Sequence, residues 1–341
     1  MIYIFSYLLS IISSFFSNKK YTLPICFLIL SILSIIRFET GNDWENYERF
    51  YNNLDQYGFL KMEPGYTLIN YLFKELSLEY YYVLAFVSLI TNILFYNQIK
   101  KTFFPFISLL LFLRFTYLQT EFMFVRQGIS IGLAYFSLAA FNNGAKKKFI
   151  LLFITAVLFH LSVLIFIPFL ALIKKKYKIQ TYILILLTSL IFVFYDFTNI
   201  INYIPIDFIK NKSLSYVEND IWNKSSEFGF SVIERILIIS SLFYLITNYA
   251  NKLPLKFYFY FNIYFIGNII YILFFKNYIF AERFSVIFNY SLIFIFPYLY
   301  FYLDDFSKKI IKNLISFFVL IYLLKTLYLS ESTLLPYKTF L

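Results

Sequence analysis

The 341-residue sequence has little cysteine, histidine, glycine or charge. One cysteine, Cys26, allows no intramolecular disulfide framework and no thiol-rich metal site. One histidine, His160, has no Asp, Cys or second His at metal-ligand spacing, so we expect neither a metal site nor a cofactor. The sequence also lacks a Gly-rich phosphate loop and an internal repeat, and the missing repeat disfavours many secondary transporters.

Hydrophobic residues dominate what is present: they form 60% of the chain, aromatic residues form 24%, and charged residues form only 14%. Apolar runs near the length that crosses about 30 Å of hydrocarbon recur from end to end. The net charge of +11 comes largely from lysines in short loops between these runs, a pattern typical of cytoplasmic loops. We therefore predict a polytopic membrane protein whose partners include membrane lipids but no nucleic acid.

The lysine clusters also predict a topology. With lysine-rich loops in the cytoplasm, residues 1–341 form one all-α membrane domain of about ten spans, and the segments 37–65 and 198–231 are external. In the first external segment, Trp44, Tyr47, Tyr51 and Leu54 recur at helical spacing, which predicts a short amphipathic helix on the outer membrane surface. A half-helix or interfacial helix is expected at 66–76.

Residues 149–173 form an apolar run about one span long with three lysines at each end, Lys146 to Lys148 and Lys174 to Lys176. A single crossing would place one triplet outside, against the distribution of positive charge in membrane proteins. We therefore predict a helical hairpin or broken helix with His160 near its deepest point; the alternative is a simple tilted span. Irregular backbone at that depth is tolerated where it is buried in protein or lines a cavity.

Three arginines stand at the starts of apolar runs that face the outer leaflet in this topology: Arg126, Arg235 and Arg283. Charges are expensive in hydrocarbon, and guanidinium groups bind phosphate through two parallel hydrogen bonds. We therefore expect the three arginines to suit a pyrophosphate group, with Arg126 and Arg283 on one polar cavity. The alternative is that Arg235 pairs with its neighbour Glu234, and Arg283 with Glu282, or that these side chains reach into the interface.

The other ionisable candidates each have a structural alternative. Asp43 and Glu63 precede expected helices, so either carboxylate could serve only as a helix cap. His160 could be a hydrogen-bonded packing residue, although its place at a predicted helix break favours a functional role. Arg114 is interpreted as a structural partner of Glu121.

Five short motifs occur in the order seen in EpsG-type, Wzy-like polysaccharide polymerases. They are Arg37 with Gly41, Asn42, Asp43 and Tyr47; Glu63, Pro64, Gly65 and Tyr66; Arg126, Gln127 and Gly128; Phe159, His160, Leu161 and Ser162; and Glu282 with Arg283. The sequence resembles this family over most of its length. The resemblance implies a bacterial inner-membrane glycosyltransferase that joins oligosaccharide repeat units carried on undecaprenyl pyrophosphate, at the periplasmic face and without a nucleotide sugar.

The resemblance also implies roles for individual residues. Asp43, Glu63 or His160 would orient or deprotonate the acceptor, and the residues do not show which of them is the base. The expected substrate-binding residues are Arg37, Tyr47, Arg126, Gln127, Arg235, Glu282 and Arg283. A chain-length regulator is a possible partner. Two other classes stay open: a flippase or other transporter of lipid-linked oligosaccharide, and a glycan ligase or membrane acyltransferase.

Overall fold

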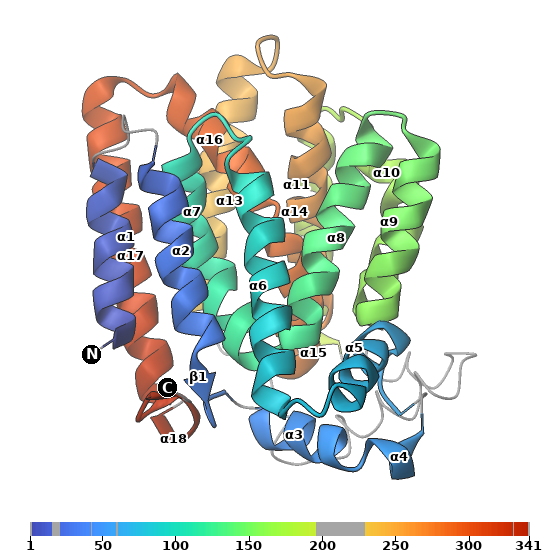
Figure 1. Cartoon of the computed structure of the whole chain (residues 1–341). Helices are drawn as coiled ribbons and strands as arrows, with labels where there is room; N and C mark the ends of the chain where they lie inside the picture. The colour runs from blue at the N-terminus through green and yellow to red at the C-terminus, as the bar shows by residue number, and fades with distance from the viewer. Residues whose placement is uncertain are drawn as a thin grey trace. The chain divides into compact units, whose positions relative to one another are not determined.

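The computed structural model describes residues 2–15, 21–41, 43–58, 61–195, 229–329 and 331–339. Almost all of the predicted external segment 198–231 lies outside these residues, as do Lys19, Lys20 and Asn42. The described chain is helical apart from one two-stranded antiparallel sheet (Figure 1). It forms two compact units, Met1–Phe166 with Phe296–Leu341, and Ile167–Ile295.

The first unit contains the helices up to and including the first half of the hairpin, and those at the C-terminal end of the chain. Its elements are α1 (Ile2–Phe15), α2 (Thr22–Ile35), β1 (Arg37–Phe38), α3 (Trp44–Asn52), α4 (Leu54–Tyr57), α5 (Pro64–Glu75), α6 (Tyr80–Ile99), α7 (Pro105–Phe112), the π-helices η1 (Leu113–Tyr117) and η2 (Gln119–Met123), α8 (Val125–Asn142), α9 (Lys146–Phe159), α17 (Asp305–Leu329), α18 (Glu331–Leu334) and β2 (Lys338–Thr339). Strand β1 pairs with β2, which ties the start of the first external segment to the C-terminal end of the chain.

The second unit contains α10 (Leu170–Ile173), α11 (Ile179–Leu190), η4 (Ile191–Phe194), α13 (Phe230–Tyr249), α14 (Leu255–Leu273) and α15 (Tyr278–Asn289). The division between the units falls inside η3 (Leu161–Phe169) and inside α16 (Leu292–Tyr302).

Four helical segments in the described residues are long and apolar enough to cross a membrane: Tyr80–Ile99, Pro105–Met123, Ser231–Tyr249 and Asp305–Leu329. A fifth is obtained if a bent pair, Phe280–Asn289 with Leu292–Tyr302, is one span. The all-α membrane class is therefore confirmed, while about ten spans stays a prediction. The two helices of this pair are bent by 56° at the break between them. At the bend, the Ser291 hydroxyl donates to the Phe288 carbonyl at 2.7 Å, a side-chain bond of the kind that competes with the helical ladder.

The predicted hairpin is visible in the contacts that α8 makes with both of its legs. The Ser137 hydroxyl donates to the Phe149 carbonyl at 2.8 Å, and Ser130 donates to the Ala156 carbonyl at 2.7 Å, so α9 runs antiparallel to α8 (Figure 1). After the turn, the centre of the Phe166 ring lies 6.0 Å from the centre of the Tyr135 ring, so the chain has turned back along α8. The turn is at His160, whose backbone is extended with φ −163° and ψ 125°. These contacts favour the hairpin over the tilted span.

The hairpin predicts that cysteines introduced at Lys147 and Lys175 are labelled from the same, cytoplasmic side of the membrane. The native Cys26 is buried and would be replaced by serine to give a silent background. A cysteine at the exposed Asp55 of α4, in the predicted external segment, serves as the opposite-side control. Labelling of positions 147 and 175 from opposite sides would exclude the hairpin.

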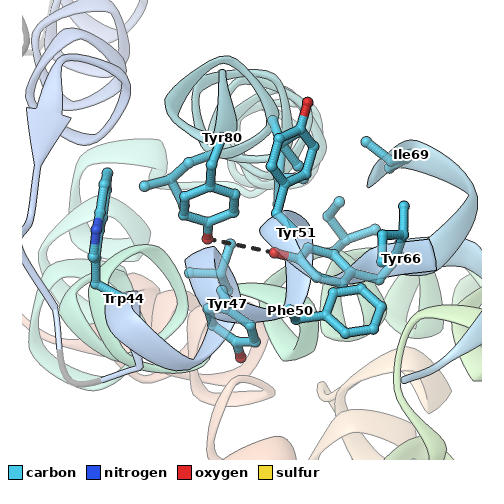
Figure 2. Close-up of a cluster of buried hydrophobic side chains, with 13 residues drawn as sticks. Trp44, Tyr47, Phe50, Tyr51, Tyr66, Ile69 and Tyr80 are labelled. Atoms are coloured by element: carbon cyan, nitrogen blue, oxygen red, sulfur yellow. Dashed lines mark hydrogen bonds between the residues drawn. The ribbon is translucent and has the colours of Figure 1, made fainter. Parts of the chain in front are cut away.

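The predicted amphipathic helix of the first external segment is α3, but protein covers its apolar face. Its buried residues are Trp44, Tyr47, Phe50 and Tyr51. They form one hydrophobic cluster with Tyr66 of α5 and with Tyr80 and Val83 of α6 (Figure 2). Protein therefore covers this apolar face, because α5 and α6 provide a surface that removes the same rings from water, while the position of the helix on the outer membrane surface stays a prediction.

Gly128 lets the start of α8 lie close to its neighbours. A Cβ atom on Gly128 would lie 2.8 Å from the Thr120 carbonyl oxygen of η2 and 3.0 Å from the Thr91 methyl group of α6. A larger residue would push these elements apart. The close approach holds the first turn of α8, with Arg126 and Gln127, against the rest of the first unit.

Candidate active site

Arg126 and Glu63 form an ion pair at the start of two helices. Arg126 is the second residue of α8, and its Nη1 donates to Oε2 of Glu63. Glu63 precedes Pro64, which begins α5, and its extended backbone at φ −61° and ψ 137° is the conformation favoured before proline. The side chains are 16% and 7% exposed, so water screens this pair only weakly. The Glu63 carboxylate therefore pairs with Arg126, whereas the structural alternative had it capping α5.

Two tyrosines form a wall around the Arg126 guanidinium. Its carbon lies 5.3 Å from the centre of the Tyr47 ring and 5.9 Å from that of Tyr66, both within cation–π range. Its Nε donates to the Tyr47 hydroxyl at 3.3 Å. Figure 2 shows the Tyr66 and Tyr80 hydroxyls directed at one another, at 3.4 Å, while the Tyr47 hydroxyl points away from them.

Burial raises the pKa of the Tyr47 hydroxyl above its ordinary value, because removal from water disfavours the phenolate. Burial likewise raises the pKa of Tyr66. Both phenols are therefore protonated at neutral pH. Tyr47 accepts a hydrogen bond from Arg126 and keeps its own proton to donate, so the wall orients the guanidinium while adding no negative charge.

The hairpin tip supplies a second polar group beside the same turn of α8. Nδ1 of His160 lies 2.6 Å from the Ser162 hydroxyl and accepts a hydrogen bond from the Ser162 backbone N–H at 3.2 Å. Gln127 donates from Nε2 to the Ser162 hydroxyl at 3.4 Å. Because Gln127 follows Arg126 in the chain, one turn of α8 carries both polar groups.

Helix α5 also lies directly against the hairpin tip. A Cβ atom on Gly65 would come within 3.0 Å of the Leu158 carbonyl oxygen, so only glycine allows this approach without a shift. The approach places Glu63, two residues earlier, on the same side of the first unit as His160. The structure thus brings together residues of four sequence motifs that are far apart in the chain.

Asp43 lies at the edge of this arrangement. It stands at the N-cap position of α3 but forms no side-chain cap hydrogen bond there, within the described part of the chain. Its negative charge acts on the Tyr47 hydroxyl, which places the carboxylate near the two tyrosines that surround Arg126.

We name Tyr47, Glu63, Arg126, Gln127, His160 and Ser162 the α8 centre. Ser162 and Tyr66 lie in the matching motifs but were not assigned roles from the sequence.

Arg37 lies elsewhere in the first unit and is enclosed by protein. It is 1% exposed, and its guanidinium carbon is 4.6 Å from the centre of the Phe122 ring. Its charged neighbour is Glu121, which is fully buried. Among the described residues, Nε and Nη1 of Arg37 and both carboxylate oxygens of Glu121 have no hydrogen-bond partner. The role of Arg37 in substrate binding stays a prediction.

The expected pairing of Arg114 with Glu121 is wrong. Both are in the π-helical end of the Pro105–Met123 segment, but the charge that faces Glu121 is Arg37. The Arg114 guanidinium lies instead over two rings, 4.7 Å from the centre of Phe115 and 4.1 Å from that of Tyr322. Each turn of a π-helix contains more residues than a turn of an α-helix, so side-chain directions over this stretch depart from the α-helical pattern that sequence spacing assumes.

A separate polar cluster surrounds Arg235 in the second unit. Its Nη2 donates to the Ser285 hydroxyl at 3.0 Å, and its Nη1 donates to Oδ1 of Asn289 at 3.3 Å and of Asn268 at 3.4 Å. Its guanidinium lies 4.0 Å from the centre of the Tyr271 ring. Oε2 of Glu282 is 3.8 Å from Nη2, so this ion pair joins α13 to α15.

Two expectations from the sequence concern residues of this second unit. The alternative that Arg235 pairs with its neighbour Glu234 is replaced by the pair with Glu282. Arg283 follows Glu282 on α15 and is half-buried. Arg126 and Arg283 belong to different compact units, and the convergence of their side chains on one cavity stays a prediction. Across the described ranges, no group of three or more His, Cys, Asp or Glu residues could hold a metal ion.

Comparison with protein-family models identifies the family to which the chain belongs. The model of the EpsG family matches residues 20–339, nearly the whole chain. No curated protein and no solved structure matches the chain. The matched range contains every residue of the α8 centre and of the Arg235 cluster.

Proposed function

Because the chain belongs to the EpsG family, we propose that this membrane protein is a polysaccharide polymerase that joins oligosaccharide repeat units carried on undecaprenyl pyrophosphate. We place the reaction at the periplasmic face of the bacterial inner membrane. The observation that supports the proposal most is the Arg126–Glu63 pair, a largely buried cation and carboxylate beside the hairpin tip. A cation for phosphate and a group that can take a proton are what this glycosyl transfer requires.

The proposed reaction displaces pyrophosphate with a sugar hydroxyl. The acceptor oxygen attacks the anomeric carbon of the donor, and a new glycosidic C–O bond forms. The bond from that carbon to the phosphate oxygen breaks, and the lipid pyrophosphate leaves with the electron pair. One proton passes from the acceptor hydroxyl to a base. Since pyrophosphate is already a good leaving group, the protein must chiefly orient two substrates, stabilise negative charge and remove one proton.

Arg126 is suited to the negative charge because its guanidinium is planar and permanently cationic. The rings of Tyr47 and Tyr66 fix the plane of the guanidinium, and the hydrogen bond that its Nε donates to the Tyr47 hydroxyl fixes its rotation within that plane. Both tyrosines are buried, so we assign them to positioning Arg126 and not to stacking on sugar. Preorganised donors are effective in catalysis because they need no reorientation when charge develops.

Glu63 is the base that this geometry favours. Before substrate binds, its carboxylate is held by Arg126 and is a poor proton acceptor, since a nearby cation stabilises the charged form. A pyrophosphate group carries more negative charge than a carboxylate and would compete for Arg126. Binding of the donor would then release Glu63 from the ion pair and make it a better base at the moment when the acceptor must lose its proton.

The test is glycan size profiling in a strain that lacks this chain. We expect long glycan to be replaced by single lipid-linked repeats on the periplasmic leaflet, and the wild-type chain to restore long glycan. Single repeats on the cytoplasmic leaflet would indicate a flippase and contradict the proposal. Long glycan that forms but stays on its lipid carrier would indicate a ligase. Membrane vesicles with purified lipid-linked repeats and the purified chain should form polymer without a nucleotide sugar.

A further inference from the structure

Arg37 of β1 and Glu121 of η2 carry opposite charges inside the first unit and are not joined by a hydrogen bond. Each is the charged neighbour of the other, and both are almost completely buried. Within the described parts of the chain, both oxygens of the Glu121 carboxylate and Nε and Nη1 of the Arg37 guanidinium have no hydrogen-bond partner. Such burial is costly, since these atoms have lost water and gained no donor or acceptor from the protein in exchange.

Two more buried polar atoms without a partner among the described residues belong to the same part of the first unit. The hydroxyls near the Glu121 carboxylate are those of Ser34 on α2 and Ser88 on α6. Ser34 donates its proton to the Ser31 carbonyl at 3.1 Å, whereas the Ser88 hydroxyl is unpartnered. Asn92 donates to the Ser34 hydroxyl at 3.0 Å and to the Ser88 carbonyl at 2.9 Å. Both of its donor bonds are thus made, and its Oδ1 is left as an unpartnered acceptor.

The aromatic rings around Arg37 do not replace the missing hydrogen bonds. The hydroxyls of Tyr3 and Tyr117 donate to main-chain carbonyls at 3.2 and 2.6 Å, and neither accepts from Arg37. The Phe122 ring lies 4.6 Å from the guanidinium carbon and offers a cation–π contact. The N–H groups lie in the plane of the guanidinium, so a ring over its face leaves them in need of acceptors.

We name the four residues that carry the unpartnered atoms the Glu121 site: Arg37, Ser88, Asn92 and Glu121. Its charges and donors select a neutral ligand that both donates and accepts. The charges of Arg37 and Glu121 already sum to zero, so a bound ion would leave a net charge buried. The guanidinium can only donate, while an ionised carboxylate and an amide oxygen can only accept. Water bonds to both kinds of group at once, and a buried water typically makes about three hydrogen bonds to such atoms.

We propose that the Glu121 site binds ordered water, which bridges the Arg37 guanidinium to the Glu121 carboxylate. The bridged pair connects β1, where the first external segment begins, to the π-helical end of the Pro105–Met123 segment. Packing makes the same connection at Gly41, where a Cβ atom would collide with the Phe122 carbonyl. The site therefore holds the start of the external segment against a membrane-spanning segment, and it does not depend on the proposed function.

Removal of the Ser88 hydroxyl gives a test whose sign discriminates. Loss of a hydroxyl that has no partner is neutral or stabilising, whereas loss of one that binds water leaves that water short of a partner. We expect Ser88→Ala to lower the apparent Tm of the full chain in lipid nanodiscs by about 2 °C. Ser6→Ala is the matched control, because Ser6 is also a buried helical serine but bonds to the Ile2 carbonyl of its own helix. Ser88→Ala at or above the wild-type Tm would overturn the proposal.

The bridge between the two charges is tested by a double-mutant cycle. Arg37→Leu and Glu121→Leu each leave the opposite charge buried alone, so each should lower the apparent Tm by about 5 °C or more. The double variant has no uncompensated charge and needs no bridging water. We expect its loss to be smaller than that of either single variant. Losses that simply add would show that the two groups are not coupled, and would overturn the bridge.

A structure of the full chain in nanodiscs that resolves ordered water tests the ligand itself. We expect density at hydrogen-bond distance, about 2.7–3.2 Å, from both the Arg37 guanidinium and the Glu121 carboxylate. Direct contact between the two groups would overturn the proposal. Exchange of Na⁺ for K⁺ or Li⁺ should leave the Tm unchanged, and a cation-specific shift that Glu121→Gln abolishes would show a cation in place of water. None of these measurements uses polymerisation, so they stand or fall separately from the proposed function.

Discussion

Replacing Arg126 with lysine is expected to lower polymerisation about a hundredfold or more, the range found when a donor to developing charge is lost. Lysine keeps the positive charge but cannot donate from two directions in one plane. In this chain those directions are used by the Tyr47 hydroxyl and the Glu63 carboxylate, and the rings of Tyr47 and Tyr66 hold the plane. The measurement is glycan length in a complemented deletion strain, with expression and membrane insertion checked on the same cells.

Arg114→Lys is the matched control for this change. Arg114 is also a buried arginine of the first unit, and its guanidinium lies over the rings of Phe115 and Tyr322. An ammonium group retains part of a cation–π contact, so the effect should be much milder. Full-length glycan from Arg126→Lys would contradict the mechanism. An equal loss in both variants would show that substitution of any buried arginine in this unit is damaging.

Glu63→Gln is expected to reduce the turnover rate by about a hundredfold, as for loss of a general base. The amide has nearly the same shape and can still accept from Arg126, but it carries no charge and cannot take the acceptor proton. Because the variant also frees Arg126 from its carboxylate, the lipid pyrophosphate should bind at least as tightly as before. The expected signature is therefore a lower kcat without a higher KM for the lipid-linked donor, measured with purified repeats in vesicles.

An ion pair of the same external segment provides the control for Glu63. Asp55 of α4 pairs with Lys74 of α5 at 2.8 Å, and the two side chains are 75% and 30% exposed. Asp55→Asn breaks this pair, and exposed pairs contribute little to stability, so polymerisation should be close to wild type. If Glu63→Gln raised KM while kcat was unchanged, Glu63 would be a substrate-binding group, and the base would have to be sought elsewhere, with Asp43 the next candidate.

Much of the fold follows from patterns that are local in the chain. Apolar runs and lysine clusters predicted the all-α membrane class, and two lysine triplets around 149–173 predicted the reversal that α8 contacts confirm at His160. The bend between α15 and α16 was missed, because both halves are apolar and the hydropathy of the segment continues across the break. The burial of α3 under α5 and α6 was missed because an amphipathic face is the same in sequence whether lipid or protein covers it.

The candidate residues were largely found from the sequence, but their partners were not. Glu63, Arg126 and His160 stood out because polar residues in apolar surroundings require compensation. That Arg126 meets Glu63, and Arg235 meets Glu282, could not be predicted, since each pair joins helices distant in the chain. The expected pairs, Arg114 with Glu121 and Arg235 with Glu234, joined near neighbours. The π-helical turns direct the side chains of Arg114 and Glu121 away from each other. The packing of α13 against α15 pairs Arg235 with Glu282 in place of Glu234.

The sequence by itself determined the membrane class, the hairpin and the residues that need a partner, because hydrophobicity and charge act through the solvent and are readable along the chain. Only the tertiary structure decided which carboxylate each arginine contacts. Those outcomes depend on distances of about 3 Å between elements, and such distances are set by how helices pack. A glycine at position 128 and another at position 65 allow the close approaches that bring the α8 centre together.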